Sequence, residues 1–156
     1  MDLKELYQDI ILEHGKSPRN HGRCEGFNHE AKGYNPLCGD KVHVYLKLNN
    51  KKQVENLTFE GEGCAISLAS ASIMTELVKG KPIIDAKKIM KDFFNMIKND
   101  TIITSNNLDE DQKTKIMSLS GVKQFPMRVK CATLSWHTLN SAMEGKKKEV
   151  NSEAID

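Results

Sequence analysis

Residues 41–64 read KVHVYLKLNNKKQVENLTFEGEGC, and they contain the clearest secondary-structure signal in the chain. Apolar and polar side chains alternate over 41–48, which predicts a strand with one buried face. An Asn-Asn-Lys-Lys turn leads to a returning strand over 54–60, so the pattern predicts an antiparallel hairpin. Two glycines then break the second strand, and Cys64 follows them directly.

Helical patterns lie on both sides of this hairpin. Apolar residues at three- and four-residue steps predict a first helix from Leu3, and a short strand is expected near 29–34. Further helices are expected over 65–78, from an Asp85 cap through Ile97, over 108–119 with a stop at Gly121, and over 128–143. We therefore predict an α+β fold, a small antiparallel β-sheet packed against helices, in a single domain over 1–145 with a charged, disordered tail over 146–156.

Composition excludes several classes of function. The 23 basic and 21 acidic residues leave a formal net charge of only +2. The sequence therefore lacks the broad excess of basic residues that is typical of nucleic-acid-binding proteins. An apolar run of about 18 residues, which a membrane span needs, is absent from the sequence, as is a secretory signal. We expect a cytoplasmic protein that binds neither nucleic acid nor a membrane, and whose four cysteines are reduced thiols.

Three cysteines fall at positions that the fold can gather. Cys38 precedes the hairpin and Cys64 follows it, so pairing of the two strands places both at one end of the sheet. Asp40 is two residues beyond Cys38, so in an extended segment both side chains face the same side. Cys131, at the start of the last helix, completes a Cys₃Asp set if that helix docks at this end.

Such a set has a chemical meaning, but the spacing leaves a second interpretation open. Three thiolates and a carboxylate suit Zn²⁺, and thiolates also hold iron in clusters. Cys64 at a helix N-terminus is expected to have a lowered pKa. Isolated cysteines, however, also pack as small buried hydrophobes. Cys24 is expected to be an incidental thiol, and His43 and His137 to be surface or packing residues rather than ligands.

The residues flanking the cysteines resemble a known family. Its motifs are matched by NPLCGD at 35–40, FEGEGCAIS at 59–67 and FPMRVKCATLSW at 125–136, with SPRN at 17–20. These stretches resemble the NifU/IscU family, specifically its SufU branch, and the resemblance runs from about residue 3 to 143. It implies a compact α+β domain of the SufE/NifU-like kind. It also implies a metal held by Cys38, Asp40, Cys64 and Cys131.

Two features favour the SufU branch. The segment 107–121 fits the insertion that this branch carries between its second and third cysteines. Lys130 stands before the last cysteine, where scaffold members of the family typically have histidine. The family's leucine-proline-proline-valine-lysine segment, which recruits a dedicated Hsp70 chaperone, is replaced here by Phe125-Pro126-Met127-Arg128-Val129.

The resemblance to the SufU branch implies a zinc protein that accepts sulfur from a SufS-like cysteine desulfurase. Cys38 is then the expected sulfur acceptor, with Cys131 the second choice, and Asp40 tunes how easily a ligand is released. Arg128 and Lys130 either attract an anionic persulfide or partner surface, or are simply solvated.

Two other functions remain open. One is a scaffold on which a transient [2Fe–2S] cluster, held by Cys38, Cys64 and Cys131, is assembled and passed to downstream iron–sulfur assembly or apo acceptor proteins. The other is an inert zinc-stabilised binding module. The sequence leaves open whether the chain is an enzyme, a zinc-dependent sulfurtransferase, or a non-enzymatic scaffold.

Overall fold

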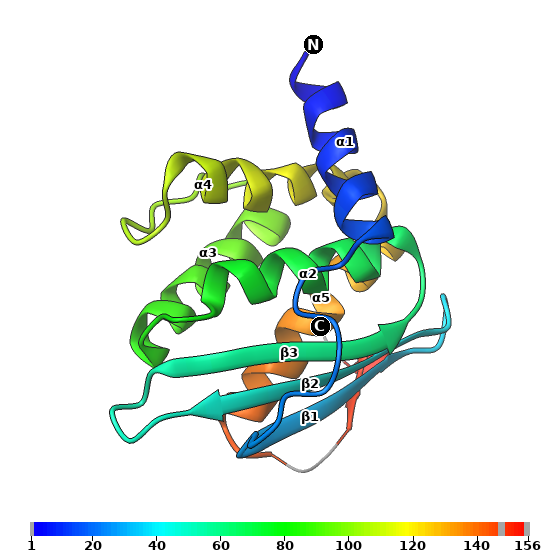
Figure 1. The fold of residues 1–156 in the computed structure, drawn as a ribbon. Helices are drawn as coiled ribbons and strands as arrows, with labels where there is room; N and C mark the ends of the chain where they lie inside the picture. Colours follow the sequence, from blue (N-terminus) through cyan, green and yellow to red (C-terminus); the bar gives the residue numbers. More distant parts are fainter. Residues whose placement is uncertain (1, 147–148, 155–156) are drawn as a thin grey trace.

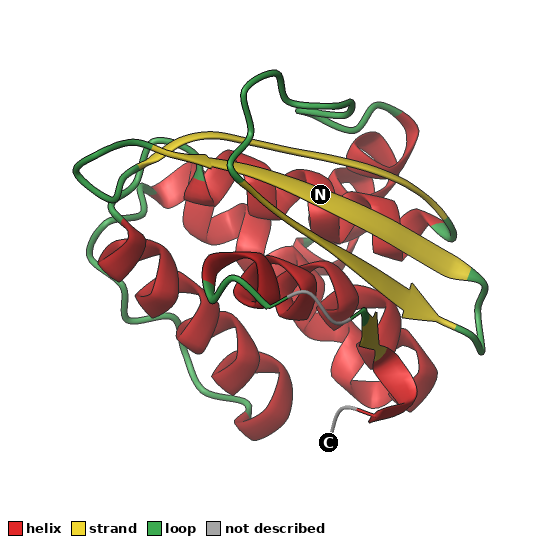
Figure 2. Cartoon of the chain, turned by 90° about the horizontal axis from the view of Figure 1, so that it is seen from below, coloured by secondary structure: helices red, strands yellow, loops and turns green. Residues whose placement is uncertain are grey.

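The computed structural model describes residues 2–146 and 149–154, which form a sheet with helices on one of its faces (Figures 1 and 2). The strands lie in the order β3-β2-β1-β4. In chain order the elements are α1 (Leu3–Lys16), β1 (His29–Asn35), β2 (Asp40–Leu48), β3 (Val54–Glu62), α2 (Ala65–Val78), α3 (Ile83–Asn99), α4 (Glu110–Met117), the 3₁₀ helix η1 (Ser118–Gln124), α5 (Pro126–Met143), β4 (Val150–Asn151) and the 3₁₀ helix η2 (Ser152–Ala154).

The predicted hairpin is confirmed, and it places both of its ends at one edge of the sheet. Strands β2 and β3 pair antiparallel, with Lys41 opposite Glu62 at the end that leads to α2. Strand β1 pairs antiparallel with β2 through a tight turn that closes at the Asn35–Asp40 pair. The predicted α+β class is therefore confirmed, although β4 adds a short parallel strand to the antiparallel sheet.

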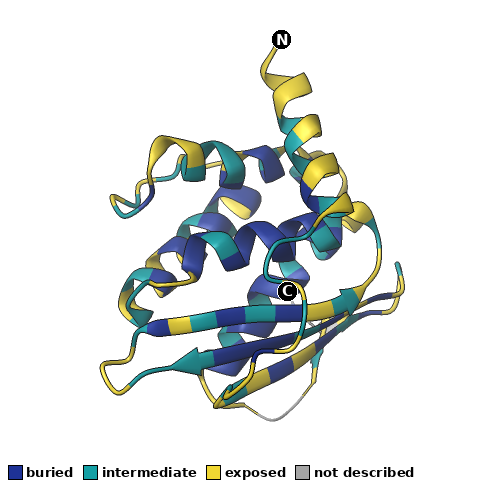
Figure 3. Cartoon of the chain, viewed as in Figure 1, coloured by how far each residue is buried: buried dark blue, intermediate teal, exposed yellow. Residues whose placement is uncertain are grey.

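Helix α5 is docked by its contacts with α2 and α3. The hydroxyl of Ser70 donates to the carbonyl of Ala132 at 2.5 Å and accepts a hydrogen bond from Nε1 of Trp136 at 2.9 Å. Trp136 also stacks on Phe93, with ring centroids 4.1 Å apart. The small side chains of α2 allow this close approach, and the buried core runs between sheet and helices (Figure 3). This packing fixes where α5 presents Cys131.

Three expectations need correction. Helix α3 begins after Pro82 rather than at an Asp85 cap, because Ile83 is already helical and Asp85 lies in the first turn. Gly121 does not end a helix, since it lies inside η1, which continues the chain from α4 towards α5. The tail was expected to be disordered, but 149–154 contain β4 and η2; positions 147–148 and 155–156 of that tail lie outside the described residues.

His14 ties α1 to α2 and makes stability depend on pH. Its Nδ1 lies 2.8 Å from the hydroxyl of Ser72, which also accepts the backbone N–H of Arg19, and its Nε2 lies 3.5 Å from Glu76. Burial lowers the pKa of His14 from its ordinary value of 6.5. The folded protein therefore holds His14 neutral at pH values where the unfolded chain binds a proton.

We expect the free energy of unfolding to fall as the pH is lowered below 6.5, because protons then favour the unfolded chain. Urea denaturation of His14→Gln at several pH values should give a shallower acid slope than the unmodified protein. His29→Asn, which changes a partly exposed histidine, serves as the matched control and should leave the slope unchanged. Equal slopes for the His14→Gln and unmodified proteins would contradict this assignment.

Candidate functional site

The turn between β1 and β2, the start of β2 and the second turn of α5 bring three potential ligands together. The sulfur atoms of Cys38 and Cys131 lie 3.3 Å apart. With one carboxylate oxygen of Asp40 they form a group in which all three atoms lie within 4.8 Å of one another. Cys131 and Asp40 are fully buried, whereas Cys38 is half-buried. The last helix therefore docks at the end of the sheet where Cys38 and Asp40 lie, which is the condition that the sequence analysis set for Cys131 to join them.

Cys38 reaches the site through a turn, not through an extended segment as the sequence analysis expected. Residues 36–39 form the turn between β1 and β2, and Gly39 has a φ of +70°. Glycine adopts this left-handed conformation without the steric cost that other residues carry. The chain reverses direction in this turn, and the Cys38 sulfur lies within 4.8 Å of a carboxylate oxygen of Asp40.

Cys64 lies beside this group but its sulfur is not within the 4.8 Å set. Its sulfur caps α2 by accepting the backbone N–H of Ser67 at 3.4 Å, and its own N–H donates to Oδ1 of Asp40 at 2.9 Å. A hydrogen bond from the Cys131 thiol lowers the pKa of Cys64 to about 6, with help from the N–H groups of the helix start. The expected lowering is present, although a neighbouring thiol contributes more than the helix terminus.

Asp40 is held on both oxygens, by the backbone of Cys64 and by Asn35, a residue that was not predicted from the sequence. Oδ1 accepts the Cys64 N–H, and Oδ2 accepts Nδ2 of Asn35 at 3.1 Å. The same Asn35 nitrogen lies 3.7 Å from the sulfur of Cys131. Asn35 is fully buried and stands inside the quoted NPLCGD motif, which was the available signal. These bonds orient the carboxylate while leaving lone pairs on each oxygen.

Gly63 makes room for that carboxylate, and we expect Gly63→Ala to destabilise the fold. Its φ is +155°, and a Cβ atom there would collide with Oδ1 of Asp40. The combined backbone and steric strain should cost about 1–3 kcal/mol, read from urea denaturation of the metal-free protein. Gly121→Ala is the matched control, since a Cβ there meets nothing within 4 Å and should change stability by less than about 0.5 kcal/mol. Equal stability of the two variants would contradict the claim that Gly63 leaves space for the Asp40 carboxylate.

The chemical types of the four candidate ligands suit zinc. Three thiolates and one carboxylate are typical zinc ligands. In the protein alone, hydrogen bonding to the Cys64 thiol, then burial, raises the pKa of the Cys131 thiol, so the adjoining thiols share protons rather than ionise together. A divalent cation neutralises such a cluster and lets the ligands deprotonate. The same thiolates also suit iron in a cluster.

Other candidate residues lie outside this cluster. Cys24 is buried, and its thiol donates to the carbonyl of Glu25. The imidazole of His43 contacts Glu30 at 2.9 Å and Tyr45 at 3.1 Å, while His137 stacks on Phe94. These environments agree with surface and packing roles for both histidines. Among the residues that the structure describes, Cys24 is not part of the group of possible metal ligands.

The two basic residues before Cys131 have different surroundings. Nζ of Lys130 pairs with Glu153 of the C-terminal segment at 2.8 Å, whereas Arg128 is exposed. Lys130 therefore binds within the chain and is not a ligand of the thiol cluster. Arg128 remains available to an anionic partner.

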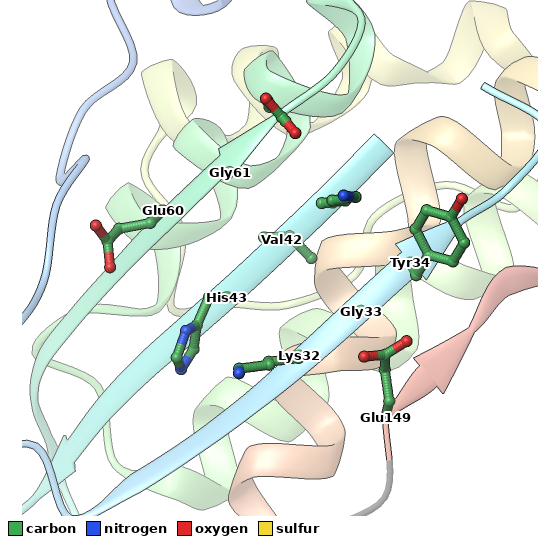
Figure 4. Close-up of a pocket in the computed structure, with 10 residues that line it drawn as sticks. Lys32, Gly33, Tyr34, Val42, His43, Glu60, Gly61 and Glu149 are labelled. Carbon is green, nitrogen blue, oxygen red and sulfur yellow. The ribbon is translucent and has the colours of Figure 1, made fainter. Parts of the chain in front are cut away.

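A groove on the sheet is separate from the thiols, since none of the cysteines lines it. It lies over β1, β2 and β3 on the face away from the helices, and its lining includes the charged side chains of Lys32, Lys41, Glu60, Glu62 and Glu149 (Figure 4). The mixed charges offer no preference for an anion or a cation. Among residues 2–146 and 149–154, none of the helices is both long and apolar enough to cross a bilayer.

Comparison with known proteins agrees with this geometry. Residues 6–144 match the family described as NifU-like N-terminal domain. The chain is 41% identical over 142 residues to the zinc-dependent sulfurtransferase SufU of Bacillus subtilis strain 168, covering 91% of this chain and 92% of that protein. It is 34% identical over 142 residues to the iron–sulfur cluster assembly scaffold protein IscU of Streptococcus pyogenes serotype M1, covering 91% and 85% of the two chains.

Solved structures share the fold. The crystal structure of a protein described as an iron–sulfur cluster assembly scaffold for the SUF system, from Fervidobacterium islandicum AW-1, has a TM-score of 0.76 and 34% identity. The match covers 89% of this chain and 97% of that chain. The N-terminal part of a NifU-like protein from Brucella abortus, at 21% identity, has a TM-score of 0.77 and covers 92% and 95% of the two chains. The second likeness speaks for the fold alone.

Proposed function

Because this chain belongs to the family of NifU-like N-terminal domains, we propose that it serves iron–sulfur cluster assembly by accepting sulfur from a cysteine desulfurase. In this proposal Cys38, Asp40, Cys64 and Cys131 hold one Zn²⁺, and the desulfurase is of the SufS kind. The observation that carries it is the meeting of Cys38, Asp40 and Cys131 within 4.8 Å, with the low-pKa thiol of Cys64 beside them.

The chain's own residues account for the sulfur transfer. Zinc, when bound, keeps its cysteine ligands deprotonated at neutral pH. The Cys38 thiolate attacks the outer sulfur of the desulfurase persulfide and forms a new S–S bond. The original S–S bond breaks, the desulfurase cysteine leaves as a thiolate, and the transferred sulfur keeps its proton. Downstream assembly proteins or apo acceptors then take this sulfur from Cys38.

Exposure favours Cys38 over Cys131 as the acceptor. Cys38 is half-buried on a turn and follows the exposed Leu37, while Cys131 is fully buried in α5. Phe125, directly before α5, and Met127, in its first turn, are also exposed, so exposed apolar side chains precede both Cys38 and Cys131 in the chain. Such exposed apolar side chains suit contact with a protein partner. A cytoplasmic setting, which keeps thiols reduced, suits the chemistry.

A scaffold role is the second candidate, supported by the relatives named IscU and by the same donors. In that role Cys38, Cys64 and Cys131 bind a [2Fe–2S] cluster as cargo and release it to apo proteins. Lys130 favours sulfur transfer, because scaffold members of the family typically have histidine at this position. Sulfur transfer would make the protein a zinc-dependent sulfurtransferase, whereas cluster assembly would make it a non-enzymatic scaffold.

Desulfurase turnover tests the proposal. A SufS-like cysteine desulfurase is assayed for alanine release from cysteine, with and without the zinc-loaded protein at substoichiometric amounts. Sulfur transfer predicts strong stimulation, because each acceptor relieves the desulfurase repeatedly once a thiol reductant removes its sulfur. No stimulation, together with an iron–sulfur cluster that forms anaerobically and moves to an apo acceptor, would favour the scaffold role instead.

A further inference from the structure

The C-terminal segment returns to the thiol cluster. Strand β4 pairs in parallel with β1, Val150 opposite Gly33 and Asn151 opposite Tyr34, and this places η2 beside the end of β1. There Ser152 is buried, with 3% of its surface exposed, and its hydroxyl donates to Oδ1 of Asn35 at 2.9 Å. Ser152 and Asn35 are 117 positions apart, so only the folded tail makes this contact.

The amide of Asn35 can take only one orientation. Its Nδ2 faces Oδ2 of Asp40 at 3.1 Å, and a carboxylate oxygen accepts but does not donate. Turning the amide over would set two acceptors against each other. Oδ1 therefore faces Ser152, and the Ser152 hydroxyl must be the donor. The hydroxyl thus holds the amide, and the amide holds Asp40 and lies beside the Cys131 sulfur.

We propose that Ser152 and Asn35 are positioning residues through which the C-terminal segment fixes the ligand geometry of the thiol cluster. The inference rests on the proposed function of that cluster, and it extends the site beyond the four proposed ligands. Residues that form hydrogen bonds with metal ligands usually orient those ligands, and removing one such residue commonly weakens metal binding by about 10–100-fold.

A second contact supports the same role for the segment. Nζ of Lys130 lies 2.8 Å from Oε1 of Glu153, and the backbone N–H of Glu153 donates to Oδ1 of Asn151 at 2.9 Å. Lys130 directly precedes Cys131, so the segment contacts both the residue before one cysteine and the amide beside its sulfur. The ion pair is partly exposed and contributes little energy by itself. The buried hydroxyl is therefore the part to test.

Ser152→Ala removes the donor without adding volume, and Ser152→Thr keeps a hydroxyl. Each protein is loaded with zinc, and the rate of zinc loss to a chromophoric chelator is measured. We expect zinc loss to be about 10-fold faster or more in Ser152→Ala and close to the unmodified rate in Ser152→Thr. Glu153→Ala, which removes only the exposed ion pair, is the matched control and should change the rate less than twofold.

A metal-free readout separates a positioning role from general stability. Alkylation of Cys131, followed by peptide mass spectrometry without zinc, should be faster in Ser152→Ala, while the urea midpoint stays within the range of Glu153→Ala. Zinc loss and Cys131 alkylation both unchanged in Ser152→Ala would overturn the positioning role. So would a fall in the urea midpoint that accounts for both effects.

These readouts also distinguish failure of this inference from failure of the proposed function. If the unmodified protein binds no zinc and accepts no sulfur, the proposed function fails, yet faster Cys131 alkylation in Ser152→Ala still supports the contact. If the unmodified protein binds zinc and accepts sulfur while Ser152→Ala behaves identically in every assay, only the positioning role fails.

Discussion

Cys38→Ala is expected to abolish stimulation of the cysteine desulfurase, lowering it by about 100-fold or more. The reason is chemical, because alanine has no sulfur to attack the persulfide. Cys131 does not replace the lost acceptor, since it is fully buried in α5. The measurement is alanine production by the desulfurase at a fixed, substoichiometric amount of each variant.

Cys24→Ala is the matched control for this loss. It likewise removes one thiol, but the Cys24 thiol donates to the Glu25 carbonyl and has no place in the cluster. Stimulation should therefore stay within about twofold of the unmodified protein. Full stimulation by Cys38→Ala would move the acceptor role to another cysteine, and Cys131→Ala would then be the next variant to assay.

Asp40→Ala has the second large expected effect, on metal retention. It removes one proposed ligand and leaves two donors, the part-buried Cys64 N–H and the buried Asn35 amide, without their acceptor. We expect zinc affinity to fall by about 100-fold or more, and the metal-free protein to lose about 1–3 kcal/mol of stability from the unpaired donors. Competition with a chromophoric chelator gives the affinity, and urea denaturation gives the stability.

Glu62→Ala controls for the loss of one negative charge near the site. Glu62 is exposed at the end of β3, opposite Lys41, and it is not among the three ligand atoms that meet. Its zinc affinity should match that of the unmodified protein. Zinc affinity of Asp40→Ala as high as that of Glu62→Ala would remove Asp40 from the proposed ligand set.

The hairpin and the position of its cysteines could be predicted because they follow from local patterns. Alternation over 41–48 identifies the buried face of the strand, and the glycine break after the second strand locates the start of α2 at Ala65. Antiparallel pairing then requires residues 40 and 62 to lie near one edge, whatever the rest of the chain does. The side-by-side placement of Cys38, Asp40 and the start of α2 is thus a consequence of short-range sequence.

The remainder of the site depends on contacts between distant segments. Docking of Cys131 relies on the packing of α5 against α2, and the Ser152–Asn35 bond relies on a two-residue strand with no alternation to reveal it. The lysine-rich composition of the tail predicted disorder because it contains little apolar surface. A buried hydroxyl and a few backbone bonds nevertheless hold 149–154 against β1.

Local errors have equally local causes. The turn at 36–39 depends on the positive φ of Gly39, which the motif allows but does not require. Pro82, with a φ of −59° and an extended ψ of 149°, lies directly before α3, so the helix begins at Ile83 and Asp85 falls in its first turn instead of capping it. In both cases the backbone geometry of one residue outweighed the side-chain pattern around it.

Trapping the transferred sulfur tests the central claim most directly. The zinc-loaded protein is mixed with a desulfurase that carries its persulfide, without free cysteine, and the products are alkylated and digested for mass spectrometry. We predict one additional sulfur on the peptide that contains Cys38, and none on the peptide that contains Cys24. Loss of the desulfurase persulfide without added sulfur on any peptide of this chain, or no loss at all, would contradict sulfur transfer to this site.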